Sequence, residues 1–105
     1  MGIPNNVINL GDRRRAEREP RTETLIIQYL DKSLETIRKE SARTENISRQ
    51  GARLLVRSAP RDIERVKVTN REHQFESTAV VRNRYVGSDG VERLCVRFID
   101  RDWID

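Results

Sequence analysis

A chain of 105 residues has room for one folded domain and excludes a second of ordinary size. Leu, Ile, Val and Phe together account for 27 residues, which is above the roughly 20% below which disorder becomes the default, so a small hydrophobic core is expected. The 21 basic and 17 acidic residues give a net charge of +4, which is compatible with an anionic partner but does not require one.

The N-terminal 12 residues contain Pro4, two glycines and three asparagines without periodicity, which predicts a flexible lead outside the folded domain. They lack the basic start and the long apolar stretch of a signal peptide, and no apolar run in the chain is long enough to cross a bilayer. We therefore expect a cytoplasmic protein with no membrane partner.

Residues 12–21 carry five arginines, three acids and almost no apolar side chain. Such a run cannot bury itself and is, taken alone, typical of a solvated linker. It predicts a flexible basic arm, and we count this arm as part of a domain covering residues 13–105.

Beyond residue 23, apolar residues alternate with polar ones, which is the pattern of strands with one buried face. Five such runs are present, and their predicted inward residues are Leu25, Ile27 and Tyr29; Ala52, Leu54 and Val56; Val66 and Val68; Phe75, Ala79, Val81 and Tyr85; and Leu94, Val96 and Phe98. The last two runs are joined by Gly87-Ser88-Asp89-Gly90, whose Asp-Gly pair suits the positive dihedrals of a tight hairpin turn. Residues 31–45 fit either a helix or a strand. Short strands separated by turn signals predict an all-β barrel or sandwich, of which we favour a small antiparallel β-barrel.

Isolated reactive residues do not assemble a catalytic site. Cys95, the only cysteine, stands in an apolar run and is expected as a packed core thiol. His73, the only histidine, falls in a polar turn and is expected to be merely exposed, while Trp103 is expected to pack over one barrel end. With no placed base, nucleophile or metal cluster, the sequence disfavours an enzyme and predicts no catalytic residue and no metal ligand.

Two motifs carry the functional signal. The first is the Arg-x-x-x-Arg pair within Arg13-Arg14-Arg15-Ala16-Glu17-Arg18, and the second is the loop Asn46-Ile47-Ser48-Arg49-Gln50-Gly51. Asn46 and Ser48 are two residues apart, so both are expected to face outward with Ile47 between them turned inward. Gly51 permits a close approach or a backbone conformation that a Cβ would block. Arg49 and Arg53 are either additional ligand contacts or solvated surface charges.

The order of these features, a basic Arg-x-x-x-Arg arm, a first strand, an Asn-x-Ser-x-x-Gly turn and a last strand ending in Val-Arg-Phe, resembles the PilZ domain family. The resemblance implies a six-stranded antiparallel β-barrel that binds the bacterial second messenger cyclic di-GMP and needs no other cofactor. It assigns ligand binding to Arg13, Arg14, Arg18, Asn46, Ser48 and Gly51. Cys95 stands where the family has glycine in the last strand, a departure that we expect to concern packing more than the ligand.

The chemistry of the ligand fits these residue types. Cyclic di-GMP carries two charged phosphates and two guanines, and arginine can pair with the phosphate or fork onto the O6 and N7 edge of guanine. Because the four arginines of residues 13–18 repel one another, we expect the arm to be open without ligand and to become ordered on binding. The signal would then pass to an unidentified protein partner.

Two other functions remain as alternatives. A small basic β-barrel can bind single-stranded nucleic acid, but such proteins stack bases on exposed aromatic residues. Phe75, Tyr85 and Phe98 are all predicted to face inward, so the sequence disfavours a nucleic-acid partner. The second alternative is a protein-interaction module with the PilZ fold that has lost its ligand.

Overall fold

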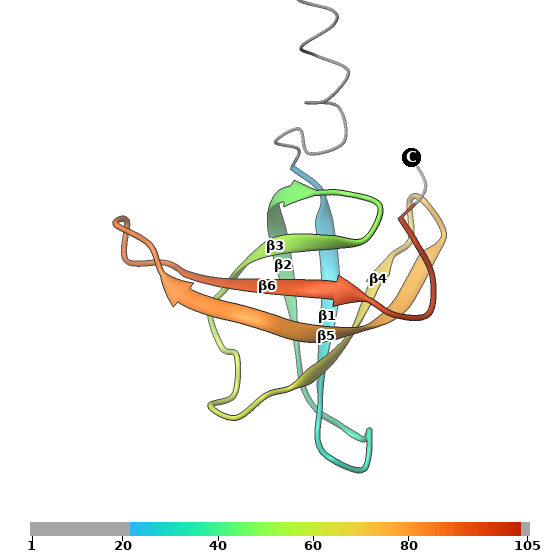
Figure 1. The fold of residues 1–105 in the computed structure, drawn as a ribbon, viewed down its shortest axis with the longest axis horizontal. Coiled ribbons are helices and arrows are strands. Elements are labelled where there is room, and N and C mark those ends of the chain that lie inside the picture. Colours follow the sequence, from blue (N-terminus) through green and yellow to red (C-terminus); the bar gives the residue numbers. More distant parts are fainter. Residues whose placement is uncertain (1–21, 104–105) are drawn as a thin grey trace, which may run out of the picture.

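The computed structural model describes residues 22–103, which form six strands (Figure 1). The strands are β1 (Thr24–Leu30), β2 (Thr36–Ile47), β3 (Gly51–Val56), β4 (Arg65–Asn70), β5 (Phe75–Val86) and β6 (Glu92–Phe98). Within these residues there is no helix long and apolar enough to span a membrane.

The six strands close into a barrel in the order β1-β2-β3-β6-β5-β4, and every pairing is antiparallel. In Figure 1, β3, β5 and β6 run across the direction of β1. The last strand, β6, lies between β3 and β5, so the end of the chain returns to the β2–β3 loop. The prediction of an all-β, six-stranded antiparallel barrel is confirmed.

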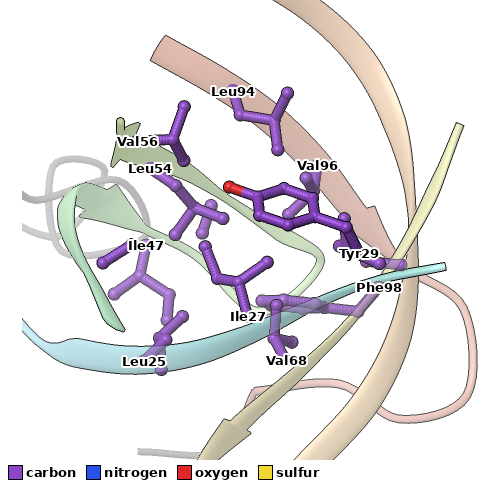
Figure 2. Packing of buried hydrophobic residues seen from close by; sticks show 14 of the residues in the cluster. Leu25, Ile27, Tyr29, Ile47, Leu54, Val56, Val68, Leu94, Val96 and Phe98 are labelled. Carbon is purple, nitrogen blue, oxygen red and sulfur yellow. The ribbon is translucent and has the colours of Figure 1, made fainter. Parts of the chain in front are cut away.

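The core consists of the inward-facing residues of each strand. The inward residues are almost fully buried, and they include Leu25, Ile27, Tyr29, Ala52, Leu54, Val56, Val66, Val68, Phe75, Ala79, Leu94, Val96 and Phe98. Figure 2 shows the Tyr29 ring inside this core, among side chains from β3 and β6. These positions agree with the alternation in the sequence, because β-branched and aromatic residues at every second position bury one face of a pleated strand.

The segment 31–45 resolves into a turn followed by a strand. Asp31 Oδ1 accepts hydrogen bonds from Ser33 N at 2.8 Å and from Glu35 N at 2.9 Å, which closes the turn between β1 and β2. Leu34 has a φ of 66° and is exposed, so its spacing from Ile37 marks no helix face. The strand interpretation of this segment is therefore right.

The predicted inward position of Tyr85 is wrong. The β5–β6 register shifts between Val81 and Asn83, so that one extra residue enters β5 as a bulge. A one-residue shift exchanges the two faces of a strand, and Tyr85 consequently lies 40% exposed, opposite Arg93.

The β5–β6 turn fits its prediction only in part. Gly90 has a φ of 80°, and Gly90 N donates a hydrogen bond to Gly87 O at 2.9 Å, but Asp89 does not share the positive φ.

Trp103 covers one barrel end, as predicted. It is 2% exposed and packs edge-on against Phe75 at a centroid distance of 5.0 Å.

Candidate functional site

The described chain begins beside the end of β2. Glu23 N donates to Thr44 Oγ1 at 2.8 Å, and Thr44 N donates to Glu23 O at 2.9 Å. The backbone that precedes β1 is thus fixed two residues away from Asn46. The predicted arm residues Arg13, Arg14 and Arg18, and the flexible lead of residues 1–12, lie outside the described residues.

Asn46 lies on the outer face of the barrel. The β2–β3 register shifts between Thr44 and Asn46, which leaves Glu45 as the extra residue of a bulge. Ile47 is 4% exposed and points into the core, as predicted, so its neighbour Asn46 points outward. Asn46 is partly buried as a residue, and its side-chain amide stays accessible to solvent and makes no hydrogen bond to any residue from 22 to 103.

Ser48 closes the turn that follows. Its backbone N donates to Gly51 O at 2.8 Å, and its hydroxyl donates to the same oxygen at 3.3 Å. The hydroxyl oxygen can still accept hydrogen bonds. Asn46 and Ser48 therefore flank the buried Ile47, and Ser48 combines a turn-forming role with a free acceptor.

Gly51 is required by close packing and not by its dihedral angles. A Cβ added at Gly51 would lie 2.3 Å from the carbonyl oxygen of Val96 and 3.3 Å from the Cα of Arg97. Both atoms belong to the backbone of β6, so neither can move aside as a flexible side chain would. Of the two reasons predicted for glycine here, the close approach is right, because Gly90 has the only positive φ among the described glycines.

The loop is held by the C-terminal part of the chain. Phe98 N donates to Gln50 O and Trp103 N donates to Arg49 O, both at 2.8 Å. Arg49 Nη2 lies 3.5 Å from Asp102 Oδ2, and the Arg49 side chain is 81% exposed. Arg49 therefore makes a solvent-exposed ion pair with Asp102 near the end of the described chain. The loop backbone forms a rigid support for Asn46 and Ser48.

A row of outward residues crosses four strands from this loop. Asn46 on β2 pairs with Arg53 on β3, Arg53 pairs with Cys95 on β6, and Cys95 pairs with Asn83 on β5. We call these four residues the outer row. Its side chains share one face because directly paired residues of an antiparallel sheet point to the same side.

The prediction of Cys95 as a packed core thiol is wrong. Leu94 is 0% exposed and Val96 is 4% exposed, so they take the inward positions of β6 and Cys95 faces outward with intermediate exposure. An unbroken apolar run hides this alternation in the sequence. Cys95 is a neighbour of Arg53 and not of the core.

The Glu45 bulge places one carboxylate between two arginines. Arg93 donates to Glu45 through Nη2 at 2.9 Å and Nε at 3.2 Å, whereas Arg53 Nη1 is 3.7 Å from Glu45 Oε1. The hydrogen bond from Arg93 is the main cause that lowers the pKa of Glu45, and the nearby Arg53 contributes less. Sequence reasoning missed Arg93, because nothing local to residue 93 indicates a partner 48 positions away.

His73 is exposed, as predicted, and it also contacts two neighbours. Its ring packs edge-on against Trp103 at a centroid distance of 5.1 Å, and its Nε2 lies 3.5 Å from Glu23 Oε1. With Glu72, these two residues form the group within the described chain whose ligand atoms, all within 4.8 Å of one another, are close enough to share a metal ion.

Two clefts open on other faces of the barrel. The larger has a volume of about 720 Å³ and lies over β1 with Ile26, Ser41 and Thr69 in its lining, and the smaller has a volume of about 490 Å³ and includes Leu34 and Ile37. Neither lining contains a predicted ligand residue. Asn46 lines neither cleft, whereas Thr22 and Glu23, where the described chain begins, line the larger one.

No protein-family model and no curated protein matches the chain. Among solved structures, the chain is similar to the PilZ domain with c-di-GMP of YcgR from Escherichia coli, with 13% sequence identity and a TM-score of 0.44. The match covers 78% of this chain and 79% of that chain.

Proposed function

We propose that this protein is a receptor domain for cyclic di-GMP, which binds on the outer face beside Asn46 and Ser48 and is covered by the N-terminal arm. The observation that carries the proposal is Asn46, a partly buried residue whose solvent-accessible side-chain amide makes no hydrogen bond to residues 22–103. It stands on a loop whose backbone is fixed by Phe98 and Trp103. A polar group that is held on a rigid backbone and is not engaged by neighbouring residues is preorganised for a ligand.

The polar groups at the loop match the ligand. The Asn46 amide offers donors and an acceptor, and the Ser48 hydroxyl, whose proton is donated to Gly51 O, offers an acceptor. Together they can bind the Watson–Crick edge of a single guanine, which presents the O6 acceptor beside N–H donors. Gly51 supports these groups indirectly, because the β6 backbone fills the place of its missing side chain and holds the loop close against β6.

The arm supplies the cations. Its arginines are joined to the barrel at Thr22 and Glu23, beside Thr44 and two residues from Asn46. Arg18 is four positions before Thr22, and such a segment spans at most about 14 Å when fully extended. The connectivity of the chain thus allows Arg18, and through it Arg14 and Arg13, to reach a ligand held at the loop.

Binding would order the arm over the ligand. The arginines repel one another until the two phosphates neutralise them, so the closed arm is stabilised only in the bound state. A closed arm changes the surface of the molecule, and this changed surface is what a protein partner would recognise.

The aromatic residues give no support to nucleic-acid binding. Tyr29, Phe75, Phe98 and Trp103 are all buried, and Tyr85 stands alone at 40% exposure on the end of β5. A strand of bases needs a series of exposed rings on which to stack. A second candidate function is therefore not proposed.

Isothermal titration calorimetry with cyclic di-GMP tests the proposal, with GTP and a single-stranded oligonucleotide as competing ligands. We expect wild-type protein to bind cyclic di-GMP in preference to both. Asn46→Ala and Arg18→Ala are each expected to weaken binding by about 1–3 kcal/mol, because each removes hydrogen bonds to a charged or paired group.

Arg61→Ala is the matched control, since Arg61 is an exposed arginine outside both motifs. Its affinity for cyclic di-GMP should equal that of the wild type. Equal losses in all variants would indicate diffuse electrostatic attraction and contradict the site. If no cyclic di-GMP concentration gave a heat of binding, the protein would be better described as a protein-interaction module that has lost its ligand.

A further inference from the structure

Arg53 stands at the centre of the outer row. It lies between Asn46 on β2 and Cys95 on β6, and its neighbours Ala52 and Leu54 are buried, so its side chain leaves the barrel on the outer face. Directly paired residues of antiparallel strands have Cβ atoms about 4.5–5.5 Å apart. A ligand that contacts the Asn46 amide is therefore within reach of the Arg53 guanidinium.

The ion pair of Arg53 is weak and replaceable. Arg53 Nη1 is 3.7 Å from Glu45, while Arg93 holds the same carboxylate with two hydrogen bonds of 2.9 and 3.2 Å. The Arg93 side chain is 11% exposed and the Arg53 side chain is 41% exposed. Glu45 would thus keep its principal partner if Arg53 moved away.

The hydrogen bonding of Arg53 is also incomplete. Its Nε is buried and has no hydrogen-bond partner among the described residues. An unpaired N–H of a charged group away from water is unfavourable. A rotation of the guanidinium away from Glu45 would bring Nε and one Nη to the surface together, and this pair of N–H groups forks onto an oxyanion.

We propose that Arg53 is a further ligand-binding residue, which leaves Glu45 and binds a phosphate of cyclic di-GMP, so that the bound nucleotide extends from Asn46 across β3 to Cys95. This inference rests on the proposed function and adds a residue and a direction to it. A phosphate is the partner because only a charged acceptor competes well with a carboxylate for a guanidinium. A neutral guanine edge does not.

Calorimetric titration of Arg53→Ala and Arg53→Lys with cyclic di-GMP measures the contribution of this residue. We expect Arg53→Ala to lose affinity about tenfold or more and to keep the wild-type melting temperature, since within residues 22–103 its one ion pair, with Glu45, is long. Arg53→Lys should recover part of the loss, because an ammonium carries the charge without the planar fork. Arg65→Ala is the control, since Arg65 is an exposed arginine on β4, which lies opposite β3 in the closed strand order.

Cys95 provides a second readout that does not depend on affinity. It is the only cysteine in the chain and is partly exposed beside Arg53. We expect saturating cyclic di-GMP to slow the alkylation of Cys95 by iodoacetamide several-fold in the wild type, while saturating GTP leaves the rate unchanged.

The outcomes separate this inference from the proposed function. If the wild type binds cyclic di-GMP but Arg53→Ala binds as tightly as Arg65→Ala, Arg53 is not a ligand residue, and the receptor function stands. If Arg53→Ala weakens binding but Cys95 is alkylated at the same rate with and without ligand, the extension toward β6 is wrong. If the wild type does not bind cyclic di-GMP, both the receptor function and this inference are wrong.

Discussion

At Gly51, a single added methyl group would clash with backbone atoms of β6. A Cβ there would stand 2.3 Å from Val96 O, so Gly51→Ala must separate β3 from β6 or distort the loop. We expect this substitution to lower the free energy of unfolding by about 1–3 kcal/mol and to weaken cyclic di-GMP binding as well. Urea unfolding and calorimetry measure the two effects.

Gly90→Ala is the control for the loss of a glycine. Gly90 has a φ of 80° but nothing lies within 4 Å of its added Cβ, so the change should cost about 1 kcal/mol through backbone strain alone. Affinity for the ligand should be unaffected, because Gly90 is in the β5–β6 turn. A Gly51→Ala protein as stable as the wild type would show that β6 does not approach the loop as described.

At the scale of elements, Glu40 joins three parts of the barrel. Its carboxylate accepts hydrogen bonds from the Tyr29 hydroxyl of β1 and from the backbone N–H groups of Arg57 and Ser58, which follow β3. Burial opposes ionisation of Glu40, but the hydrogen bonds from Tyr29, Ser58 and Arg57 outweigh it and lower its pKa. The ionised carboxylate is therefore more stable in the folded protein than in the unfolded chain.

This pKa shift predicts how stability depends on pH. A carboxylate with a lowered pKa contributes stability that is fully present above its ordinary pKa of 4.5 and is lost as the pH falls through its value in the folded protein. Glu40→Gln should be less stable than the wild type at pH 7, by about 1–2 kcal/mol, and the difference should shrink below pH 4.5. Urea midpoints at pH 7 and pH 3.5, about one unit below that value, measure this.

Glu35→Gln is the control, because Glu35 is exposed in the β1–β2 turn and only its backbone makes a hydrogen bond in the described chain. It should match the wild type at both pH values within about 0.5 kcal/mol. A Glu40→Gln difference that stays constant from pH 7 to pH 3.5 would contradict a special role for the ionised carboxylate.

The sequence was sufficient for five strands because each contains a run in which buried residues alternate with more exposed ones. It could not decide β2, since Thr36–Lys39 are exposed on both faces and the alternation begins only near Ala42. It also missed the bulges after Thr44 and Val81. Neither bulge is marked by a glycine, so a register shift that moves Tyr85 outward leaves no local sign.

The candidate site shows the same division. The outward direction of Asn46 and the close approach at Gly51 follow from local spacing and residue type, and the structure bears out both. The partners of Arg53 could not be predicted in this way. Cys95 is distant in the sequence and pairs with Arg53 only in the folded barrel, and Glu45 lies near Arg53 only because of a bulge in β2. Contacts of this kind depend on barrel closure.

At the scale of the whole molecule, closure of the barrel brings both ends of the described chain to the β2–β3 loop. Glu23 is bound to Thr44 before the loop, and Trp103 is bound to Arg49 within it (Figure 1). β6 lies beside β3 because the strand order is β1-β2-β3-β6-β5-β4. The face proposed to bind ligand is therefore assembled from the loop, the last strand and the point where the arm joins.

The central claim is that cyclic di-GMP binds this face and orders the arm. The most direct test is a ¹H–¹⁵N NMR titration of the full chain with cyclic di-GMP, combined with amide exchange. The account predicts shifts at Asn46–Gly51, Arg53 and Cys95, new protection of the amides of residues 13–18, and little change along β4. Shifts confined to the cleft around Ile26 and Thr69, or amides of residues 13–18 equally protected with and without ligand, would contradict it.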